Sequence, residues 1–425
     1  MGTDNLEAIA ELPKESSYEV VSQPLVQSPP SPQCEVCVIV PVQNEAETLE
    51  STLAALAHQI DLESCLLDST RYEIILLANN CSDTSAALAQ RFASHHPTLA
   101  LHVVEKTLPA TDAYIGRVRQ ILMDEAYRRL ISLGQKRGVI ASTDGDTQVA
   151  PTWIAATLHE IACGADAVGG RIVTDRVSRA ALDSYARACY LREVGYCYLV
   201  AELETYLDTD PDDVWPRHYQ HYGASLAVTA EMYEQAGGMP PVRTPEDVAF
   251  YRALVRVNAR FRHSPLVRVT TSARQTGRTN IGLANQLNEW TAMGQRQQPF
   301  LVKSVAEIET RLRARHGLRV LWERILDGYQ PTPKEVAPLA NTLGIATHWL
   351  TNELAQSHSF GLLFERVEQR QQQEEIWWQR WSGVKIEQAI WELRVRLDYL
   401  RRQQKPRSCW KYNSPDTIRQ AAGRA

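Results

Sequence analysis

Short apolar runs alternate with amphipathic stretches over the first third of the chain. Runs rich in β-branched and aliphatic residues, typical of buried strands, lie at 37–42, 72–79, 100–106 and 137–146. Between them, apolar residues recur at helical spacing within 44–60, 82–96 and 116–134. This alternation predicts an α/β fold, with a mixed, mostly parallel sheet flanked by helices.

The pattern changes at both ends of the chain. Residues 1–33 are polar and finish in the proline-rich "SQPLVQSPPSPQ", which predicts a disordered leader. Residues 34–295 continue as one α/β domain, with a long helix expected over 178–205. From 296 to 425 the sequence turns to Gln, Arg, Glu and Trp and predicts an α-helical C-terminal region. Its Trp and Leu stripes indicate a core, a partner-facing surface such as a homodimer interface, or contact with a membrane surface.

Charge and composition narrow the class of protein. The net charge of −5 argues against general affinity for nucleic acid, which needs basic surfaces. No apolar run reaches transmembrane length, and the first residues lack the pattern of a signal peptide, so we expect a cytoplasmic protein. The eight cysteines are scattered; Cys34 and Cys37 form a C-x-x-C that predicts buried free thiols, with a redox or metal role as the alternative.

Polar residues follow three of the predicted strands. Asn44 and Glu45 come after the first strand, residues 79–83 after the second, and Asp144 and Asp146 after the fourth. Ligands of such sheets bind beyond the carboxyl ends of the strands, so these clusters predict one site. Taken alone, "DGD" fits a metal site, a helix cap or a polar turn.

Four ordered motifs carry a resemblance to a known family. They are "VIVPVQNEAETL", "LLANNCSDTS", "STDGDT" and "PEDVAFYRAL". Together they resemble the GT-A glycosyltransferases of family 2, in their soluble bacterial type, from about Val36 to Gln286. The resemblance implies a Rossmann-like fold that binds a nucleotide-diphospho-sugar, with "STDGDT" as the D-x-D motif.

The resemblance also implies a divalent cation, Mn²⁺ or Mg²⁺, that stabilises the leaving diphosphate. Asp146 is the expected direct ligand, and Asp144 would bind the ribose or a metal-bound water, since these cations prefer oxygen ligands. Gly145 would let the backbone approach the nucleotide. His263 is a further candidate metal ligand, with a hydrogen-bonded histidine outside the site as the alternative.

Donor-binding residues are expected on several segments. The resemblance points to a base pocket made by Pro41, Asn44, Glu45, Asn79, Asn80 and Asp83. The family usually has Asp where this chain has Asn79-Asn80, so UDP is the favoured nucleotide rather than a fixed one; Asp83 also fits a helix cap. Four arginines are expected to face the diphosphate, or else to lie on ordinary surface: Arg117, Arg119, Arg274 and Arg278.

The last motif implies the chemistry. Asp247 would be the base that deprotonates an acceptor hydroxyl, with Glu246 positioning the acceptor, in an inverting single displacement. The alternative for Asp247 is a carboxylate favoured by a helix N-terminus. Processive relatives carry Q-x-x-R-W, but "QLNEW" (286–290) lacks the arginine, so we expect a non-processive, hexosyltransferase-like enzyme. A catalytically idle GT-A domain that binds or scaffolds, and another nucleotide chemistry on a similar fold, are the competing hypotheses.

Overall fold

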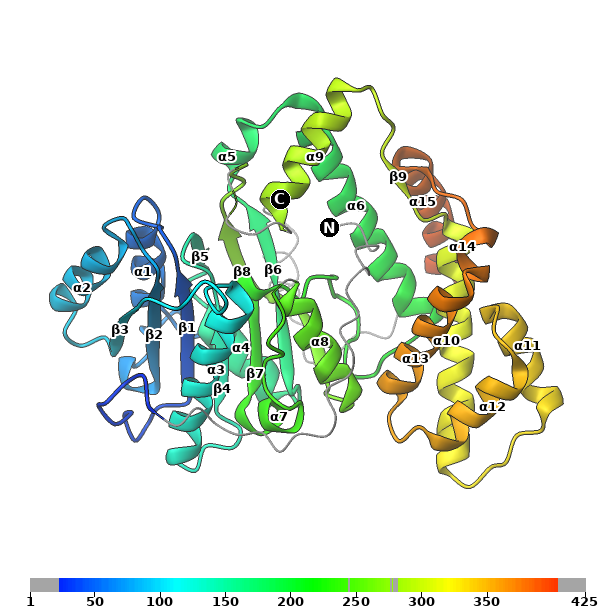
Figure 1. The fold of residues 1–425 in the computed structure, drawn as a ribbon, viewed down its shortest axis with the longest axis horizontal. Coiled ribbons are helices and arrows are strands. Elements are labelled where there is room, and N and C mark those ends of the chain that lie inside the picture. The colour runs from blue at the N-terminus through cyan, green and yellow to red at the C-terminus, as the bar shows by residue number, and fades with distance from the viewer. Residues whose placement is uncertain (1–22, 244, 276, 278–281, 404–425) are drawn as a thin grey trace. The chain divides into compact units, whose positions relative to one another are not determined.

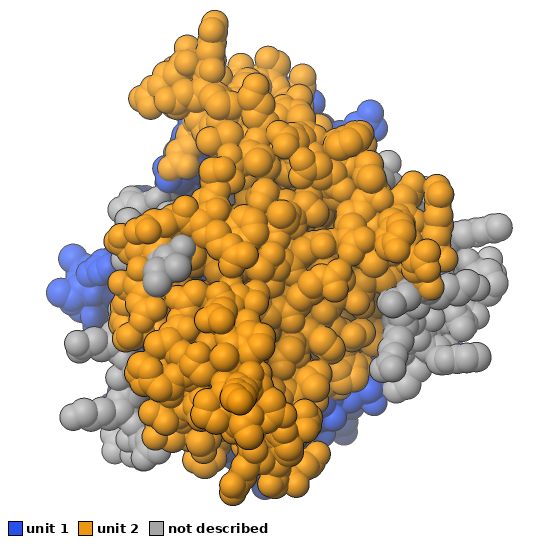
Figure 2. Space-filling view, turned by 90° about the vertical axis from the view of Figure 1, so that its right-hand side faces the viewer, with its two compact units in different colours: residues 1–182, 220–254, 259–288 blue, residues 183–219, 255–258, 289–425 orange. Residues whose placement is uncertain are grey.

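The computed structural model describes residues 23–243, 245–275, 277 and 282–403. The chain forms two compact units, and each is made of segments that are separate in sequence (Figures 1 and 2). The first unit comprises residues 1–182, 220–254 and 259–288, and the second comprises 183–219, 255–258 and 289–425. The domain boundary at residue 295 stays a prediction.

The first unit is built on one eight-stranded sheet with the strand order β3-β2-β1-β4-β7-β6-β8-β5. Four of its seven neighbouring pairs are parallel and three are antiparallel. The strands are β1 (Val36–Val42), β2 (Tyr72–Asn79), β3 (Leu101–Lys106), β4 (Val139–Ser142), β5 (Thr147–Val149), β6 (Ala167–Thr174), β7 (Leu226–Thr229) and β8 (Phe261–Thr271). The predicted α/β class with a mixed, mostly parallel sheet is confirmed.

Helices cover both faces of this sheet (Figure 1). Alternate β1 residues, Val36, Val38 and Val40, join the main core with α1, α2 and α4, while α3 packs on the opposite face. Their bounds are α1 (Leu49–Ala57), α2 (Ser85–His95), α3 (Ile115–Ser132), α4 (Trp153–Ala162), α5 (Arg176–Ala180) and α7 (Ala230–Gln235). Short 3₁₀ turns lie at η1 (Ser69–Arg71) and η2 (Gly223–Ser225).

Two predicted elements differ from the structure. The strand expected over 137–146 ends at Ser142, because the chain turns at Asp144-Gly145 before β5 pairs with β8. The helix expected over 178–205 is two helices, α5 and α6 (Ser184–Leu207). The break is fixed by Asp183, whose side chain accepts hydrogen bonds from the N–H groups of Tyr185 and Ala186 and so begins a new helix.

The second unit is helical, which confirms the predicted C-terminal helices. Its elements after residue 288 are β9 (Leu301–Val302), α10 (Val305–Leu326), α11 (Pro333–Leu343), α12 (Thr347–Gln356), α13 (Phe360–Glu374), α14 (Ile376–Arg380), β10 (Val384–Lys385) and α15 (Ile386–Gln403). One apolar cluster contains residues of α10, α11, α12 and α13, and another contains residues of α6, α10 and α15. The chain passes between the units within α8 (Glu246–Arg256) and α9 (Leu283–Gln295). Among the described helices, none combines the length and apolarity needed to cross a bilayer.

Candidate active site

The turn between β4 and β5 places Asp144 and Asp146 at an edge of the sheet. Thr147 N–H closes the turn on the Asp144 carbonyl at 3.1 Å. Gly145 keeps this turn close to β1, since a Cβ there would lie 3.1 Å from Glu45 Cγ and 3.2 Å from Val42 Cγ2, both tight contacts. The glycine thus lets the turn press against the end of β1 and brings Glu45 close to the D-x-D carboxylates.

Arg274, which follows β8, contacts two of these carboxylates. Its guanidinium donates two hydrogen bonds of 2.7 Å to Glu45 and lies 3.1 Å from an oxygen of Asp146. Burial raises the pKa of Asp146, and the nearby negative charge of Asp144 raises it further, against the opposing effect of Arg274. A buried Asp146 with a second carboxylate beside it forms a site to which a divalent cation adds positive charge.

Arg119 lies in α3 and is only 3% exposed. It donates to Asp144 Oδ1 at 3.0 Å, to Glu246 Oε1 at 3.3 Å and to the Gly223 carbonyl at 3.0 Å, and it also donates to the Ser142 hydroxyl. The sequence led us to expect Arg119 at the diphosphate. In the structure, the N–H groups of Arg119 instead donate to acceptors of the protein itself. Arg119 therefore joins the D-x-D turn to the start of α8.

Arg117 lies two residues before Arg119 on the same helix, and its expected contact with the diphosphate stays a prediction. Its side chain is partly buried and donates to Gln120 Oε1 at 2.6 Å within α3. The structure therefore gives Arg117 a local partner on its own helix. Arg278 lies outside the described residues.

Glu246 and Asp247 begin α8. Asp247 Oδ2 accepts from the Gly223 N–H at 3.0 Å, and Oδ1 accepts from the Val248 N–H at 2.8 Å. Burial raises the pKa of Asp247, and burial together with the charge of Asp247 raises the pKa of Glu246 to about 7. A carboxylate that binds a proton near neutral pH suits proton transfer in catalysis.

Gly223 is the site residue for which the sequence assigned no role. Its N–H holds Asp247, its carbonyl accepts from Arg119, and a Cβ at this position would lie 2.4 Å from Arg119 Nη2. Only glycine leaves room for the guanidinium. The signal available in the sequence is the glycine in "HYGAS" just before a buried strand, but its partner Arg119 lies 104 residues away.

Residues expected in the base pocket gather at the ends of β1 and β2. Asn44 Oδ1 accepts from the N–H groups of Ser82 and Asp83 at 2.8 and 3.3 Å. Asp83 in turn accepts from the N–H groups of Ala46 and Ser85 at 3.1 and 3.0 Å. Burial raises the pKa of Asp83, but the hydrogen bonds from Ser85 and Ala46 outweigh it and lower the pKa. Asn44 and Asp83 therefore fasten the two loops together.

The two asparagines have different roles in this pocket. Asn80 uses its side chain for two hydrogen bonds to the backbone of Leu108, at 2.9 and 3.0 Å. Asn79 is 3% exposed, and among the described residues its Oδ1 has no hydrogen-bond partner. A buried polar atom without a partner is costly in the free protein, so Asn79 is the asparagine that a ligand would satisfy. Pro41 lies on β1 opposite Leu77, and its carbonyl is 3.4 Å from where a Gly145 Cβ would be.

His263 does not join the two aspartates. It lies near the start of β8, where it pairs with Gly169, whereas the far end of β8 at Thr271 pairs with Thr147 beside Asp146. Its Nε2 lies 3.4 Å from Nδ1 of His221, whose ring stacks on Tyr251 at 3.9 Å. The register therefore does not support His263 as a ligand of a metal held by Asp144 and Asp146.

The C-x-x-C is a second cluster with ligating atoms. Within the described part of the chain, Cys34, Cys37 and Glu73 are the only three such residues with their ligand atoms within 4.8 Å of one another. Arg129 already donates to both oxygens of Glu73, at 2.7 and 2.6 Å. Burial raises the pKa of Cys37 well above its ordinary value and keeps the thiol neutral, and it donates to Glu73 at 2.9 Å. A buried guanidinium beside neutral thiols opposes a cation, so these are structural thiols.

Comparison with known proteins identifies the class. Residues 37–183 match the model of glycosyl transferase family 2. Over this segment, which is about a third of the chain, the protein is similar to family 2 glycosyltransferases, and together with the mixed sheet the match confirms the predicted GT-A class. No curated protein matches the chain.

Three solved structures illustrate the similarity. The mannosyltransferase PcManGT from Pyrobaculum calidifontis, with GDP-Man and Mn²⁺, is 19% identical over 82% of this chain and 79% of its own, with a TM-score of 0.39. TarS 1-349 from S. aureus, with UDP-GlcNAc, is 12% identical over 80% and 92%, with a TM-score of 0.42. Glucosyl-3-phosphoglycerate synthase from Mycobacterium tuberculosis, with Mn²⁺, UDP-Glc and phosphoglyceric acid, is 14% identical over 63% and 81%, with a TM-score of 0.33.

The pKa of Glu246 gives a testable pH dependence. Because the native pKa is about 7 and the ordinary value is 4.5, the native state binds this proton more tightly than the unfolded state. The resulting stabilisation is complete below the unfolded pKa and is lost as pH rises through the native pKa. In metal-free buffer, the free energy of unfolding should thus fall between about pH 5 and pH 8 more steeply in the wild type than in Glu246→Gln.

Urea titrations across this pH range measure the effect. Glu231→Gln is the matched control, because Glu231 is an exposed carboxylate in the first turn of α7. In Glu231→Gln, the free energy of unfolding should fall with pH as steeply as in the wild type. Equal slopes in wild type and Glu246→Gln would show that Glu246 is ionised like an ordinary surface carboxylate.

Proposed function

We propose that this glycosyltransferase is metal-dependent and inverting, and that it moves a sugar from a nucleoside-diphosphate donor to a hydroxyl acceptor, one residue per encounter. The observation that carries the proposal is the joint arrangement of the D-x-D turn with Asp247. Arg119 bonds Asp144 on one side and Glu246 on the other, so the metal-binding turn and the start of α8 form one hydrogen-bonded unit. Donor activation and acceptor deprotonation need groups held together in this way.

The carboxylates fit a hard divalent cation. Asp144 and Asp146 remain 33% and 15% exposed at the side chain, so both have access to a ligand. Mn²⁺ or Mg²⁺ typically takes few protein oxygens and fills its shell with water and phosphate. When bound, such an ion stabilises the negative charge that develops on the leaving diphosphate. The solved structures of similar proteins with Mn²⁺ support this choice of metal.

This chain's own residues have separate tasks in the proposed reaction. Arg274 and Glu45 border the D-x-D turn, and Arg274 brings a positive charge to the side where the diphosphate would bind. Asp247, held by the Gly223 N–H, would accept the proton of the acceptor hydroxyl, and Glu246 beside it would orient that hydroxyl. A single displacement at the anomeric carbon then inverts its configuration.

Asn79 supports a uridine donor without requiring it. Its amide has one oxygen acceptor and two N–H donors, and the buried oxygen lacks a partner among the described residues. A base edge with one N–H between carbonyl groups, as in uracil, matches such an amide. Guanine, which presents N–H groups and a carbonyl, is the second candidate.

Asp146→Ala tests the metal-binding part of the proposal. Calorimetric titration of UDP in the presence of Mn²⁺ should show binding in the wild type and at least about a hundredfold weaker binding in the variant, because a charged metal ligand is lost. Asp68→Ala is the matched control, since Asp68 is an exposed carboxylate in a turn, bonded to Thr70. Unchanged manganese-dependent affinity in Asp146→Ala would remove Asp146 from the metal site.

A catalytically idle domain is the competing function. It predicts nucleotide binding with no transfer in any donor and acceptor combination. The pairing of Arg119 with both Asp144 and Glu246 favours an active enzyme, because a binding domain has no need for Glu246 and Asp247 beside the donor site.

A further inference from the structure

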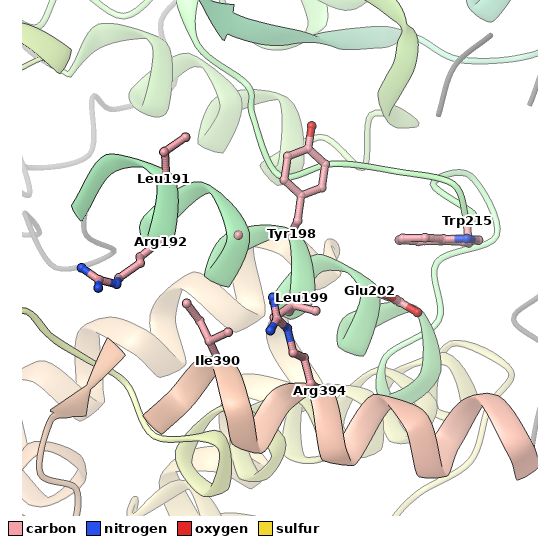
Figure 3. A pocket seen from close by; sticks show the side chains of 9 residues that line it. Leu191, Arg192, Tyr198, Leu199, Glu202, Trp215, Ile390 and Arg394 are labelled. Atoms are coloured by element: carbon pink, nitrogen blue, oxygen red, sulfur yellow. The ribbon is translucent and has the colours of Figure 1, made fainter. Parts of the chain in front are cut away.

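The second unit has a surface hollow of about 390 Å³ between α6 and α15 (Figure 3). Its volume lies within the usual range of small-molecule sites, roughly 300–1,000 Å³. From α6 it is lined by Leu191, Arg192, Gly195, Tyr198, Leu199 and Glu202, from the loop after α6 by Trp215, and from α15 by Ile390 and Arg394. Most of this lining is apolar or aromatic, and its charged groups are two arginines and one glutamate.

Gly195 on α6 is the residue of the lining that has no side chain. A Cβ at Gly195 would meet no atom within 4 Å, so the space beside it is open. Farther along both helices, α6 and α15 are joined by a packed core that includes Leu203, Leu393 and Leu397. Leu191 at the rim is 52% exposed, which leaves apolar surface in contact with water. The site therefore offers an unfilled apolar surface on otherwise closely packed helices.

The charges of the lining are not balanced. Glu202 accepts two hydrogen bonds of 2.7 Å from Arg401, so its negative charge is already compensated. Arg192 has one ion pair, 3.3 Å from Glu387, in which both side chains are about half exposed. Arg394 forms no ion pair with any residue that the structure describes, and Figure 3 shows it reaching from α15 toward Leu199. The hollow therefore combines apolar walls with a positive charge available to a ligand.

We propose that this hollow binds an amphiphile with one apolar chain and an anionic head group, a carboxylate or a phosphate. The chain would lie along Leu199 and Ile390 over Gly195, where it removes apolar surface from water. The head group would bind Arg394, whose planar fork suits both kinds of anion. The proposal rests on residues of the second unit alone and is independent of the reaction proposed above.

Calorimetric titration of the full chain tests this site with defined probes below their micelle concentrations. Dodecyl phosphate and dodecanoate should both bind, and the tighter of the two identifies the head group. Inorganic phosphate lacks the chain and dodecyltrimethylammonium has the wrong charge, so neither should bind measurably. Equal binding of the cationic amphiphile would overturn the proposal.

Matched variants separate the site from general surface binding. Arg394→Gln should weaken the binding of dodecyl phosphate at least about tenfold, the loss expected for one charge-assisted contact. Arg402→Gln removes a charge from the same helix at an 82% exposed position, and it should change the affinity for dodecyl phosphate less than about twofold. Gly195→Leu should abolish binding by filling the space, while Gly195→Ala should retain part of it.

Two results would contradict the assignment. Unchanged affinity in both Arg394→Gln and Gly195→Leu, with wild-type melting temperatures, would place the amphiphile elsewhere. Sedimentation with phosphatidylglycerol vesicles that persists in Gly195→Leu, without binding of monomeric probes, would indicate a membrane-facing surface instead.

Discussion

Asp247→Asn is expected to leave donor binding nearly unchanged and to lower kcat by about 10²–10⁴-fold, the usual contribution of a general base. Asparagine has the shape of aspartate, but its amide nitrogen cannot take a proton from the acceptor hydroxyl. The Gly223 N–H, which now donates to Asp247 Oδ2 at 3.0 Å, can still bond the amide oxygen, while the bond from the Val248 N–H to Oδ1 is lost, so the donor affinity also reports whether the start of α8 keeps its place. Initial rates at saturating donor measure kcat, and calorimetric titration measures the donor affinity.

Glu231→Gln is the control for this experiment. Glu231 is also a carboxylate in the first turn of a helix, α7, and it is exposed. If Asp247 acted only through the helix dipole, the two substitutions would have similar, small effects. Wild-type turnover in Asp247→Asn would place the base elsewhere.

Arg119→Met is expected to destabilise the protein by about 3–5 kcal/mol, the range for breaking a buried ion pair on one side. The substitution leaves Asp144 and Glu246 without their shared cation and removes the donors to Ser142 and the Gly223 carbonyl. Burial lowers the pKa of the Arg119 guanidinium, but Asp144 and Glu246 outweigh this and raise it, so the side chain stays charged. Urea unfolding monitored by circular dichroism measures the loss.

Arg117→Met provides the comparison on the same helix. Arg117 is partly buried and bonds only Gln120 among the contacts described above, so its loss should cost under about 1 kcal/mol. A loss in Arg119→Met no larger than that in Arg117→Met would mean that Arg119 does not hold the two carboxylates together.

The sequence predicted the sheet, and the polar residues that follow its strands, because both depend on local patterns. Apolar runs gave the first three strands nearly to the residue, and the parallel order β3-β2-β1-β4 brings Asn44, Asn79 and Asp144 to strand ends on one side of the sheet. The break before α6 also had a local signal, since Asp183 is a preferred N-cap residue. The helix predicted over 178–205 includes this position.

Contacts between distant residues were outside the reach of such patterns. Arg274 meets Glu45 across 229 residues, and Arg119 meets Glu246 across 127. One clue was present for Arg119: it is three positions before Leu122 and seven before Ala126, which face the core. A charged residue on the apolar side of a helix indicates a buried ion pair rather than a ligand contact.

The central claim is that the D-x-D turn and the base pocket bind a nucleoside diphosphate through a metal. Thermal unfolding of the full chain with UDP, GDP, ADP, CDP and TDP, each with and without Mn²⁺, tests it most directly, because a ligand of the native state raises the melting temperature by mass action. We predict a rise with one nucleotide, UDP, that requires Mn²⁺ and disappears in Asp146→Ala. No rise with any nucleotide in the presence of Mn²⁺ would contradict the donor site and favour a domain without transferase activity.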